Sequence, residues 1–323
     1  MNSQLFIKKE TEGKFGKAPE ERSTEEIIKY GIVNIDKPKG PTSHQVSDYV
    51  KKILSVDKAG HSGTLDPQVS GVQPVAISKA TRIVEFLLTA PKEYVCVMHL
   101  HKDIDEQKLH EITQQFVGKI KQLPPIKSAI KRQIREREIY EFEIIEIKGR
   151  EVLFRVKCQA GTYIRKLCHD LGQALGTGAH MAELRRTQAG PFREEDKLIT
   201  LNDLDDAMHF YCDEHNDKFL RYCIQPVEDA LKYLNKCWIF DTTIQSVTHG
   251  RALAIPGISK LENFRKGETV AIMTLKGELV AIGEAVMSGV EVNTQQRGIA
   301  IKVRKVFMDE INKEDTTILQ NKA

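Results

Sequence analysis

Apolar residues recur along this chain at two spacings, one typical of helices and one typical of strands. The run 162–175 places apolar side chains three and four residues apart and is followed by Gly176, which predicts an amphipathic helix that ends there. Two alternating runs, 139–147 and 152–158, flank a short polar link and predict a β-hairpin. Strands and helices are mixed without a regular strand–helix–strand repeat. The pattern therefore predicts an α+β fold rather than a doubly wound one.

Shorter signals predict the neighbouring elements. Capping boxes that begin at Ser23 and Thr42 each predict the start of a helix. The segment 94–100 alternates like a strand, and 83–88 is an apolar helical stretch. Apolar residues spaced for one helical face predict a single helix further along the chain: Leu109, Ile112, Phe116 and Ile120.

The pattern changes near residue 236. From there the chain reads as short strands separated by glycine turns, as in the pair 269–275 and 278–283, which Lys276 and Gly277 join. This predicts a small β-barrel domain that is large enough to fold alone. We expect four segments along the chain: an N-terminal extension (1–30), a main domain (31–235), the small β domain (236–310) and a polar tail (311–323).

Composition narrows the class of protein. Of the 323 residues, 41% are hydrophobic and 29% are charged, which is typical of a globular protein. The charged N-terminus lacks the apolar segment of a signal peptide, so we expect a cytoplasmic location. The six cysteines show no CxxC spacing, which argues against a zinc site, and free thiols fit a reducing compartment.

The formal net charge of +3 does not itself indicate a nucleic-acid partner, but one segment is strongly basic. Between Lys119 and Arg137 lie seven lysines and arginines, opposed by Glu136. Such a run forms either a solvated surface or a surface that neutralises phosphates and releases counterions. Charge alone leaves both alternatives open.

The segment 60–67 carries one acid, Asp66, in a loop rich in conformationally special residues. Gly60 and Gly63 permit backbone angles that other residues avoid, and Pro67 pushes Asp66 toward an extended conformation. An acid held in this way can serve as a nucleophile or a base. The alternative is an Asp-Pro turn whose carboxylate caps nearby N–H groups.

Three further residues have both a structural and a chemical interpretation. Arg165 falls in the first turn of the predicted 162–175 helix, where a cation is disfavoured, so we expect a carboxylate partner and propose Asp66, in a buried pair that keeps the acid ionised. Solvent exposure is the alternative. Tyr94 is either a core aromatic or a surface that stacks on a base. His61 either bonds within its loop or fills the space that an extruded base leaves.

Six motifs, in order along the chain, resemble those of one known family. They are Tyr30-Gly31 through His44, the loop 60–71, 92–95, 124–129, 160–165 and 178–187. On these motifs the chain resembles the TruB family of pseudouridine synthases, and looks most like its archaeal, dyskerin-like branch, which works in box H/ACA ribonucleoproteins. The segment 238–308 is similar to a PUA domain. Three positions, Gln68, Gln73 and Pro91, depart from the residues usual in the family.

The resemblance implies a fold and a role for each candidate residue. It implies a mixed, mainly antiparallel sheet flanked by helices, followed by the small PUA barrel. Asp66 corresponds to the catalytic aspartate, Arg165 to the arginine that pairs with it, and Tyr94 to the tyrosine that stacks on the target base. His61 corresponds to the residue that occupies the vacated stack, and Leu184 to an apolar residue of the base pocket.

The same resemblance implies RNA-binding residues outside the catalytic centre. Lys37 belongs to a motif that supports the catalytic loop and counts among the candidate RNA contacts. Residues 122–137 correspond to a thumb loop that grips substrate RNA. Its candidate contacts are Lys127, Lys131, Arg132 and Arg135. The candidate contacts of the PUA domain are His249, Gly250, Arg251, Pro256 and Gly257.

The implied reaction converts uridine in RNA to its C-glycoside isomer, which needs neither a cofactor nor a metal. Asp66 could attack C6 of the base, attack C1′ of the ribose, or assist departure of the base through a glycal-type intermediate. The implied substrates are ribosomal RNA selected by a box H/ACA guide RNA, the T-loop uridine of tRNA, or both. The implied protein partners are a zinc-ribbon, a glycine-arginine-rich and a kink-turn-binding protein. The alternative function is a non-catalytic RNA-binding scaffold of the same particle.

Overall fold

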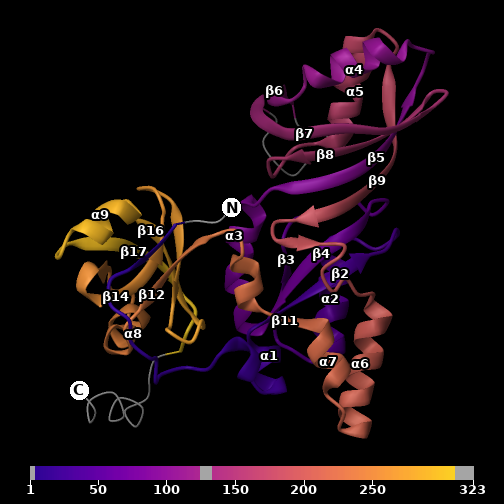
Figure 1. Cartoon of the computed structure of the whole chain (residues 1–323). Helices are drawn as coiled ribbons and strands as arrows, with labels where there is room; N and C mark the ends of the chain where they lie inside the picture. The colour runs from indigo at the N-terminus through magenta and orange to yellow at the C-terminus, as the bar shows by residue number, and fades with distance from the viewer. Residues whose placement is uncertain (1–3, 124–132, 310–323) are drawn as a thin grey trace. The chain divides into compact units, whose positions relative to one another are not determined.

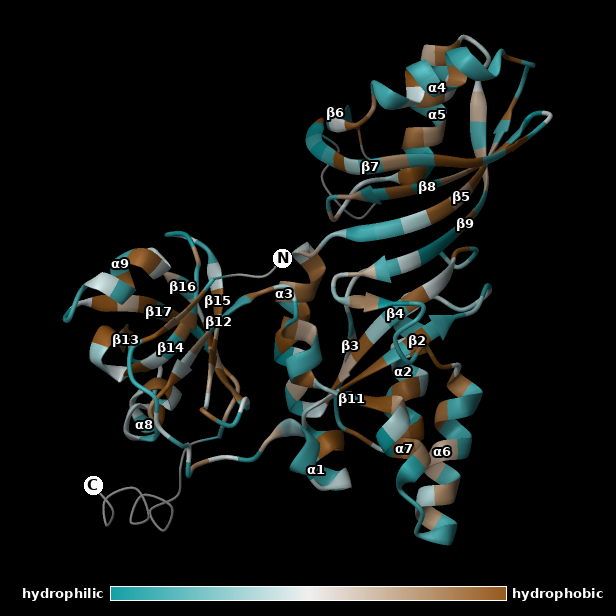
Figure 2. Cartoon of the chain, in the orientation of Figure 1, coloured by the Kyte–Doolittle hydropathy of each residue, from teal (hydrophilic) through white to brown (hydrophobic). Residues whose placement is uncertain are grey.

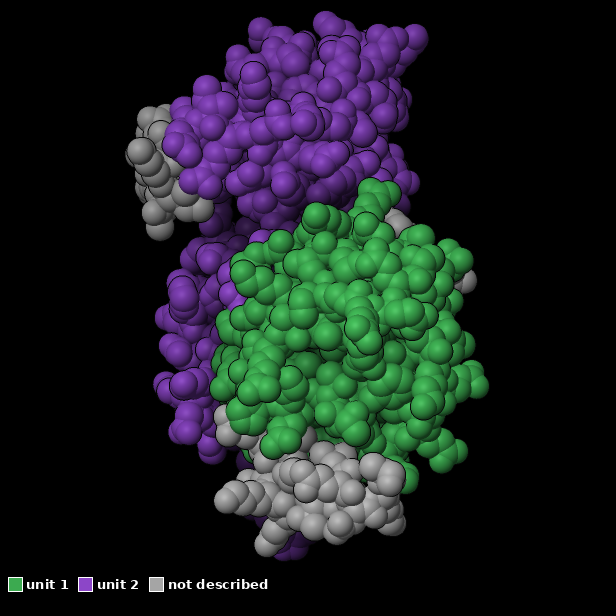
Figure 3. All heavy atoms as spheres, turned by 90° about the vertical axis from the view of Figure 1, so that its left-hand side faces the viewer, with its two compact units in different colours: residues 1–32, 78–82, 224–323 green, residues 33–77, 83–223 purple. Residues whose placement is uncertain are grey.

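The computed structural model describes residues 4–123 and 133–309, and Figure 1 shows the course of the chain. The chain divides into two compact units, which Figure 3 draws in different colours. One unit comprises residues 33–77 and 83–223, and the other comprises residues 1–32, 78–82 and 224–323. Lys127, Lys131 and Arg132 lie outside the described residues.

The unit of residues 33–77 and 83–223 is built on a mixed sheet. Strand β9 (Ala179–Ala189) lies beside β4 (Ser70–Ile77) and β5 (Lys92–Leu100), parallel to the first and antiparallel to the second. The sheet continues antiparallel through β8 (Glu151–Cys158), β7 (Arg135–Lys148) and β6 (Gly118–Gln122). Strand β2 (Gly31–Lys37) follows β4 on the other side, and the short strands β3 (Ala59–His61) and β10 (Phe192–Arg193) pair with β4 and β9. The α+β class and the mainly antiparallel sheet are confirmed.

Helices cover this sheet in two groups. Helix α5 (Ile164–Leu175) buries its apolar face against β5, β8 and β9, together with α4 (Glu106–Gln114). Helix α2 (Ser43–Ile53) packs against α6 (Leu201–Glu214), which in turn packs against α7 (Lys218–Cys223). Figure 2 shows hydrophilic and hydrophobic residues mixed along α6, as expected for a helix with one buried face. Helix α3 (Val84–Thr89) precedes β5.

The second unit contains a curled sheet of its own. Its strands follow the order β1 (Leu5–Ile7), β14 (Ile258–Glu262), β12 (Asn235–Ile239), β15 (Thr269–Met273), β16 (Leu279–Ala285), β17 (Ile299–Val306) and β13 (Leu253–Ala254). Among the described strands this order has two ends, so the predicted small barrel is a curled half-barrel. Helices α8 (Asp241–Thr248) and α9 (Gly289–Thr294) contribute buried residues to its core.

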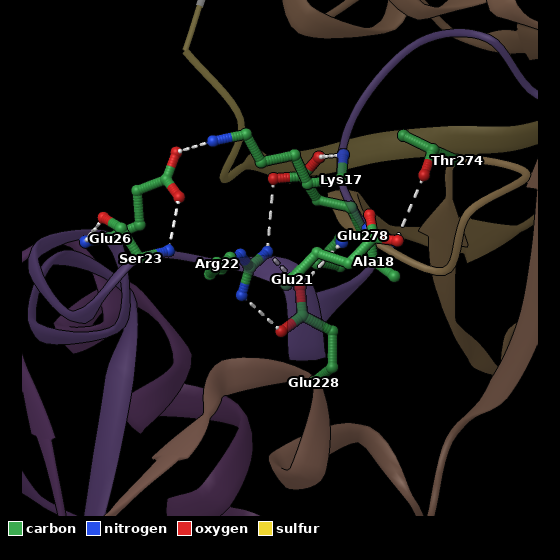
Figure 4. Close-up of polar contacts among 10 residues, drawn as sticks. Lys17, Ala18, Glu21, Arg22, Ser23, Glu26, Glu228, Thr274 and Glu278 are labelled. Carbon is green, nitrogen blue, oxygen red and sulfur yellow. Dashed lines mark hydrogen bonds and ion pairs between the residues drawn. The ribbon is translucent and has the colours of Figure 1, made fainter. Parts of the chain in front are cut away.

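The N-terminal segment belongs to this second unit. Strand β1 pairs antiparallel with β14, a pairing that the sequence analysis missed. After the short 3₁₀ turn Pro19–Glu21, Arg22 places its guanidinium between two carboxylates (Figure 4). It bonds Glu228 through two hydrogen bonds of 2.8 and 2.7 Å and Glu278 through one of 3.2 Å. Helix α1 (Thr24–Lys29), strand β11 (Ile224–Pro226) and the 3₁₀ turn Val227–Leu231 complete this region.

Most predicted elements are confirmed, and one is wrong. The capping boxes at Ser23 and Thr42 are present, and α5 ends at Gly176, which adopts φ 74°. The predicted helix over 109–120 ends at Gln114, because Gly118 turns the chain with φ 97° and Ile120 lies in β6. No described helix is long and apolar enough to cross a membrane.

Candidate active site

The loop between β3 and β4 carries Asp66, and a close backbone contact fixes the end at which β4 begins. Gly63 adopts φ 131°, as predicted, whereas Gly60 has no positive φ. Gly71 has φ 106°, and a Cβ atom there would lie 2.2 Å from the carbonyl oxygen of Arg186. Because only glycine tolerates that approach, β4 can pair directly with β9 where the loop ends.

A serine at the start of α2 holds the centre of the loop. The Ser43 hydroxyl accepts a hydrogen bond from the Leu65 amide at 2.8 Å and donates to the Leu65 carbonyl at 3.2 Å. Leu65 itself is 4% exposed, so its apolar side chain anchors the loop beside the acid. Gln73 donates to the Ser43 carbonyl at 3.0 Å, so this departure from the family pattern supports the same contact.

Lys37 supports the loop through hydrogen bonds to backbone carbonyls. Its side chain is fully buried, and its ammonium donates to the carbonyl oxygens of Pro38, Pro67 and Val69 at 2.9, 3.3 and 2.8 Å. Burial lowers the pKa of this ammonium, and neighbouring Arg186 lowers it further. The geometry agrees with a role in supporting the loop. It corrects the expectation that Lys37 also contacts RNA, because its ammonium faces the protein interior.

Arg186 is the centre of the site. On β9, its backbone lies opposite Tyr94 of β5 and Gly71 of β4. Its guanidinium is buried and donates to the Val72 carbonyl at 2.7 Å and to the Gly63 carbonyl at 3.3 Å from both terminal nitrogens. It also interacts with the Tyr94 hydroxyl.

The structure joins Asp66 and Arg165, as predicted. The Arg165 guanidinium donates from Nη2 to Asp66 Oδ2 at 2.6 Å. Arg165 is the second residue of α5, so the helix positions it and the ion pair offsets the unfavourable helix end. The two side chains are 59% and 55% exposed, so the expectation of a buried pair is wrong.

The Asp66 carboxylate does not cap its own turn. Among the described residues its hydrogen-bond partner is Arg165, whereas the turn is closed by its backbone carbonyl, which accepts from the Val69 amide at 3.0 Å. The acid is therefore held by its backbone and oriented by one guanidinium. Its carboxylate remains open to solvent and to a substrate.

Tyr94 and Leu184 lie on neighbouring strands. Tyr94 is half-buried on β5, next to the guanidinium of Arg186. Burial raises the pKa of its phenol, while Arg186 opposes the shift. Leu184 lies opposite Cys96 and packs against the core of this unit while remaining partly accessible. Both positions fit the flanks of a base pocket.

His61 lies at the end of β3, beside the loop. Its ring meets the ring of His44 edge-on, with centroids 4.9 Å apart, and its Nδ1 accepts from the Gly63 amide at 3.3 Å. Burial, together with the neighbouring His44 and Arg186, lowers the pKa of His61 to about 4. His61 is therefore neutral at pH 7, a state suited to stacking against bases.

A third buried cation, Lys92, completes the floor of the site. Its ammonium donates to the carbonyls of Leu87 and Ala90, both at 2.8 Å. Burial lowers the pKa of Lys92 to about 7. Among the described residues no carboxylate lies within ion-pair distance of Lys37, Lys92 or Arg186. Backbone carbonyls accept from all three groups, and Arg186 also interacts with the Tyr94 hydroxyl. The buried guanidinium of Arg186 places a positive charge beside the loop of Asp66, which favours an anion or an RNA strand.

The remaining candidate residues fall in two other places. Arg135 opens β7 and pairs with Gln122, at the base of the predicted thumb. His249, Gly250 and Arg251 follow α8, whereas Pro256 and Gly257 belong to a turn that contacts Thr243 near the start of that helix. Both parts of the PUA motif thus border one helix of the second unit, and their RNA contacts stay a prediction.

Sequence reasoning missed Arg186, Lys92 and Ser43 as parts of the site. All three lie within the six motifs, but buried cations bound to carbonyls leave no signal in charge or spacing. The described residues also contain no group of three or more His, Cys, Asp and Glu side chains that could hold a metal ion.

Comparison with known families agrees with this geometry. Residues 51–164 match the TruB family pseudouridylate synthase (N terminal domain), and 165–232 match the tRNA pseudouridylate synthase B C-terminal domain. Residues 235–307 match the PUA domain and 2–47 the DKCLD (NUC011) domain. The chain is 54% identical over 300 residues to the probable tRNA pseudouridine synthase B of Pyrococcus horikoshii, covering 93% of this chain and 90% of that one.

A second relative and two solved structures extend the comparison. The chain is 53% identical to the probable tRNA pseudouridine synthase B of Methanothermobacter thermautotrophicus, with 91% of each chain covered. It resembles a chain of a Cbf5–Nop10–Gar1 complex at TM-score 0.92 and 52% identity, covering 96% of this chain and 95% of that one. It resembles a chain of an H/ACA RNP bound to a substrate RNA at TM-score 0.90 and 50% identity, covering 96% of each. The chain therefore belongs to the TruB family of pseudouridine synthases.

Proposed function

We propose that this chain isomerises uridine to pseudouridine in RNA as the catalytic subunit of a box H/ACA guide-RNA particle acting on ribosomal RNA, on the T-loop uridine of tRNA, or on both. The observation that carries the proposal is the 2.6 Å pair between Asp66 and Arg165. An exposed carboxylate is fixed there in the middle of a loop that Ser43, Lys37 and Arg186 hold by hydrogen bonds. Relatives with the same architecture are probable tRNA pseudouridine synthases and a subunit of an H/ACA particle.

The geometry supports a division of labour within the site. Asp66 supplies the ionised oxygen that attacks C6 or C1′, or that assists departure of the base. Arg165 fixes the position of this oxygen through its 2.6 Å hydrogen bond. Tyr94 offers its ring to the extruded base, and His61, neutral at pH 7, fills the space that the base leaves. The product contains the same atoms as the substrate, so no outside reactant enters the reaction.

The solved relatives suggest which kinds of protein and RNA this chain binds. Because solved relatives occur in complexes with Nop10, Gar1 and substrate RNA, we propose that this chain also assembles with proteins of an H/ACA particle. The zinc-ribbon, glycine-arginine-rich and kink-turn-binding classes remain our expectation for these proteins. A cytoplasmic location is part of the same proposal.

Replacement of Asp66 tests the enzyme against the scaffold. Asp66→Asn keeps the shape of the side chain and removes its charge, so we expect RNA binding without product. The matched control is Asp57→Asn, since Asp57 is an exposed acid just before β3. Pseudouridine is mapped on tRNA and on guide-loaded ribosomal RNA fragments after incubation with each variant. Product formation by Asp66→Asn at the wild-type rate would remove Asp66 from the mechanism.

Sequencing of co-purified RNA separates the two substrate classes. Guide RNAs that end in ACA support the particle, whereas tRNA alone supports an enzyme that acts without a guide. If the wild-type chain, supplied with the particle's proteins, forms no pseudouridine on either RNA, the scaffold is the better interpretation.

A further inference from the structure

A recess lies along the seam between helix α5 and the first residues of strand β9, beside the catalytic pair. Its volume is about 360 Å³, and it is lined by Arg165, Lys166, His169, Ala179, His180 and Met181. Arg165 is thus shared, because it bonds Asp66 on one side and lines the recess on the other. The recess therefore lies next to the place where a nucleotide would meet Asp66.

The recess combines an apolar floor with imidazole rings. Ala179 and Met181 pack against the buried core of the unit and present their remaining surface to the recess. His169 and His180 are exposed, and a 2.9 Å hydrogen bond to His101 holds the His180 ring in place. A planar, partly apolar group that can stack on an imidazole fits this lining.

The strand beside the recess has an unpaired edge. Residues 179–189 pair with β5 along one side, but on the other side β9 meets β4 only at Arg185 and Arg186. Over 179–184 the described structure therefore leaves backbone N–H and C=O groups without a strand partner. Such groups can bond the polar edge of a nucleobase, as strand edges bond other extended ligands.

The charges at the recess place the phosphate at Arg165. Lys166 is ion-paired with Asp170 one turn further along α5, so its charge is already neutralised. Among the described residues, Arg165 donates only from Nη2 to Asp66. No described residue accepts from its other donors, which can bond the phosphate that joins the target nucleotide to its neighbour.

From this geometry we infer that the recess between α5 and β9 binds the nucleobase adjacent to the target uridine, with the connecting phosphate at Arg165. The inference rests on the proposed function and adds a second nucleotide site to it. The enzyme then unstacks two nucleotides: the target uridine, which reacts, and its neighbour, which binds in the recess. Binding of the neighbouring base would hold the RNA strand in place while the target base detaches from its ribose.

A combination of protein variants and modified RNA tests the site. The double variant His169→Ala/His180→Ala removes both rings from the exposed side of the recess and leaves the core intact. The control is His110→Ala, an exposed histidine on α4 outside the recess. Each protein is measured with intact substrate RNA and with RNAs that are abasic at either neighbour of the target uridine, by single-turnover kinetics and by Kd.

On intact RNA we expect the double variant to lose about 5- to 100-fold in affinity, the range for loss of base stacking. One of the two abasic RNAs lacks the base that binds in the recess. Wild type and variant should bind this RNA with the same Kd, because the imidazole rings then have no base on which to stack. Equal losses on intact and both abasic RNAs, or no loss on intact RNA, overturn the inference. Wild-type turnover is measured in parallel, so a failure of the proposed function would show there as absence of product.

Discussion

Arg186 holds the carbonyl oxygen of Gly63 from both of its terminal nitrogens at 3.3 Å, three residues before Asp66. The backbone of the same arginine lies opposite Gly71, where the catalytic loop ends. Its guanidinium also meets the hydroxyl of Tyr94. One buried side chain therefore links the loop of the acid to the strand of the tyrosine. Its neighbour Arg185 instead bonds the carboxylates of Asp36 and Glu194.

This position predicts that Arg186 controls catalysis without contacting RNA. Arg186→Met leaves the carbonyls of Gly63 and Val72 without a donor, so we expect unfolding to become about 2 to 4 kcal/mol easier. The turnover rate should fall at least tenfold while the Kd for RNA stays within about twofold. Chemical denaturation and single-turnover kinetics measure the two effects.

Two variants distinguish a role of Arg186 in positioning the catalytic loop from a general loss of stability. Arg186→Lys keeps the charge but loses the forked geometry, so it should recover stability more than rate. Arg193→Met removes an exposed arginine of β10 and should change neither. If Arg186→Met turns over at the wild-type rate, the arginine serves only the fold.

The sequence predicts the catalytic pair because its signals are local. Arg165 breaks a helix-end preference, and Asp66 lies in a loop whose glycine and proline residues are informative by themselves. The structure joins the two residues across 99 positions. Their exposure was not predictable, because it depends on how far α5 and the loop stand above the sheet.

Non-local features account for what the sequence analysis missed. Strand β1 is three residues long and finds its partner only at β14. Strand β9 lies within a motif that shows no clear alternation, and its pairing with β5 is interrupted by register shifts, which change the face toward which successive side chains point. The cations Lys37, Lys92 and Arg186 look like surface residues in the sequence, because their partners are backbone carbonyls brought together by the fold.

Because of Lys92, the free energy of unfolding should change with pH in the alkaline range. Burial lowers its pKa from 10.5 to about 7 in the folded protein. Between these values the unfolded chain holds the proton and the folded chain does not, so the contribution of Lys92 to stability increases as pH rises from 7 toward 10. The gain over that window is on the order of 3 kcal/mol.

Comparison with Lys92→Met isolates this effect from other titrating groups. The free energy of unfolding is measured for both proteins by denaturant titration at pH 7, 8, 9 and 10. We expect the wild-type value to rise relative to that of the variant across the series. Parallel curves would show that Lys92 keeps its usual pKa despite its burial.

Arg22 should be a major support of the second unit. Its partners Glu228 and Glu278 have side chains only 10% and 21% exposed. Removal of the guanidinium therefore leaves two poorly solvated carboxylates without a counter-charge. We expect Arg22→Met to lose about 3 to 5 kcal/mol of stability. Lys17→Ala breaks the exposed pair with Glu26 and should cost less than about 1 kcal/mol. Similar midpoints of denaturation for the two variants would contradict this ranking.

The basic run that we predict to form the thumb loop should determine how RNA binding depends on salt. Lys131, Arg132 and Arg135 belong to the run that either faces solvent or neutralises phosphates, and each phosphate contact contributes about 0.7 to 0.9 to the slope of log affinity against log salt concentration. Their joint replacement by Ala should therefore weaken RNA binding and reduce that slope by about 2. Lys119→Ala is the control, because its ammonium is already paired with Glu136 at 3.0 Å and should change the slope little. An unchanged slope in the triple variant would assign the run to a solvated surface.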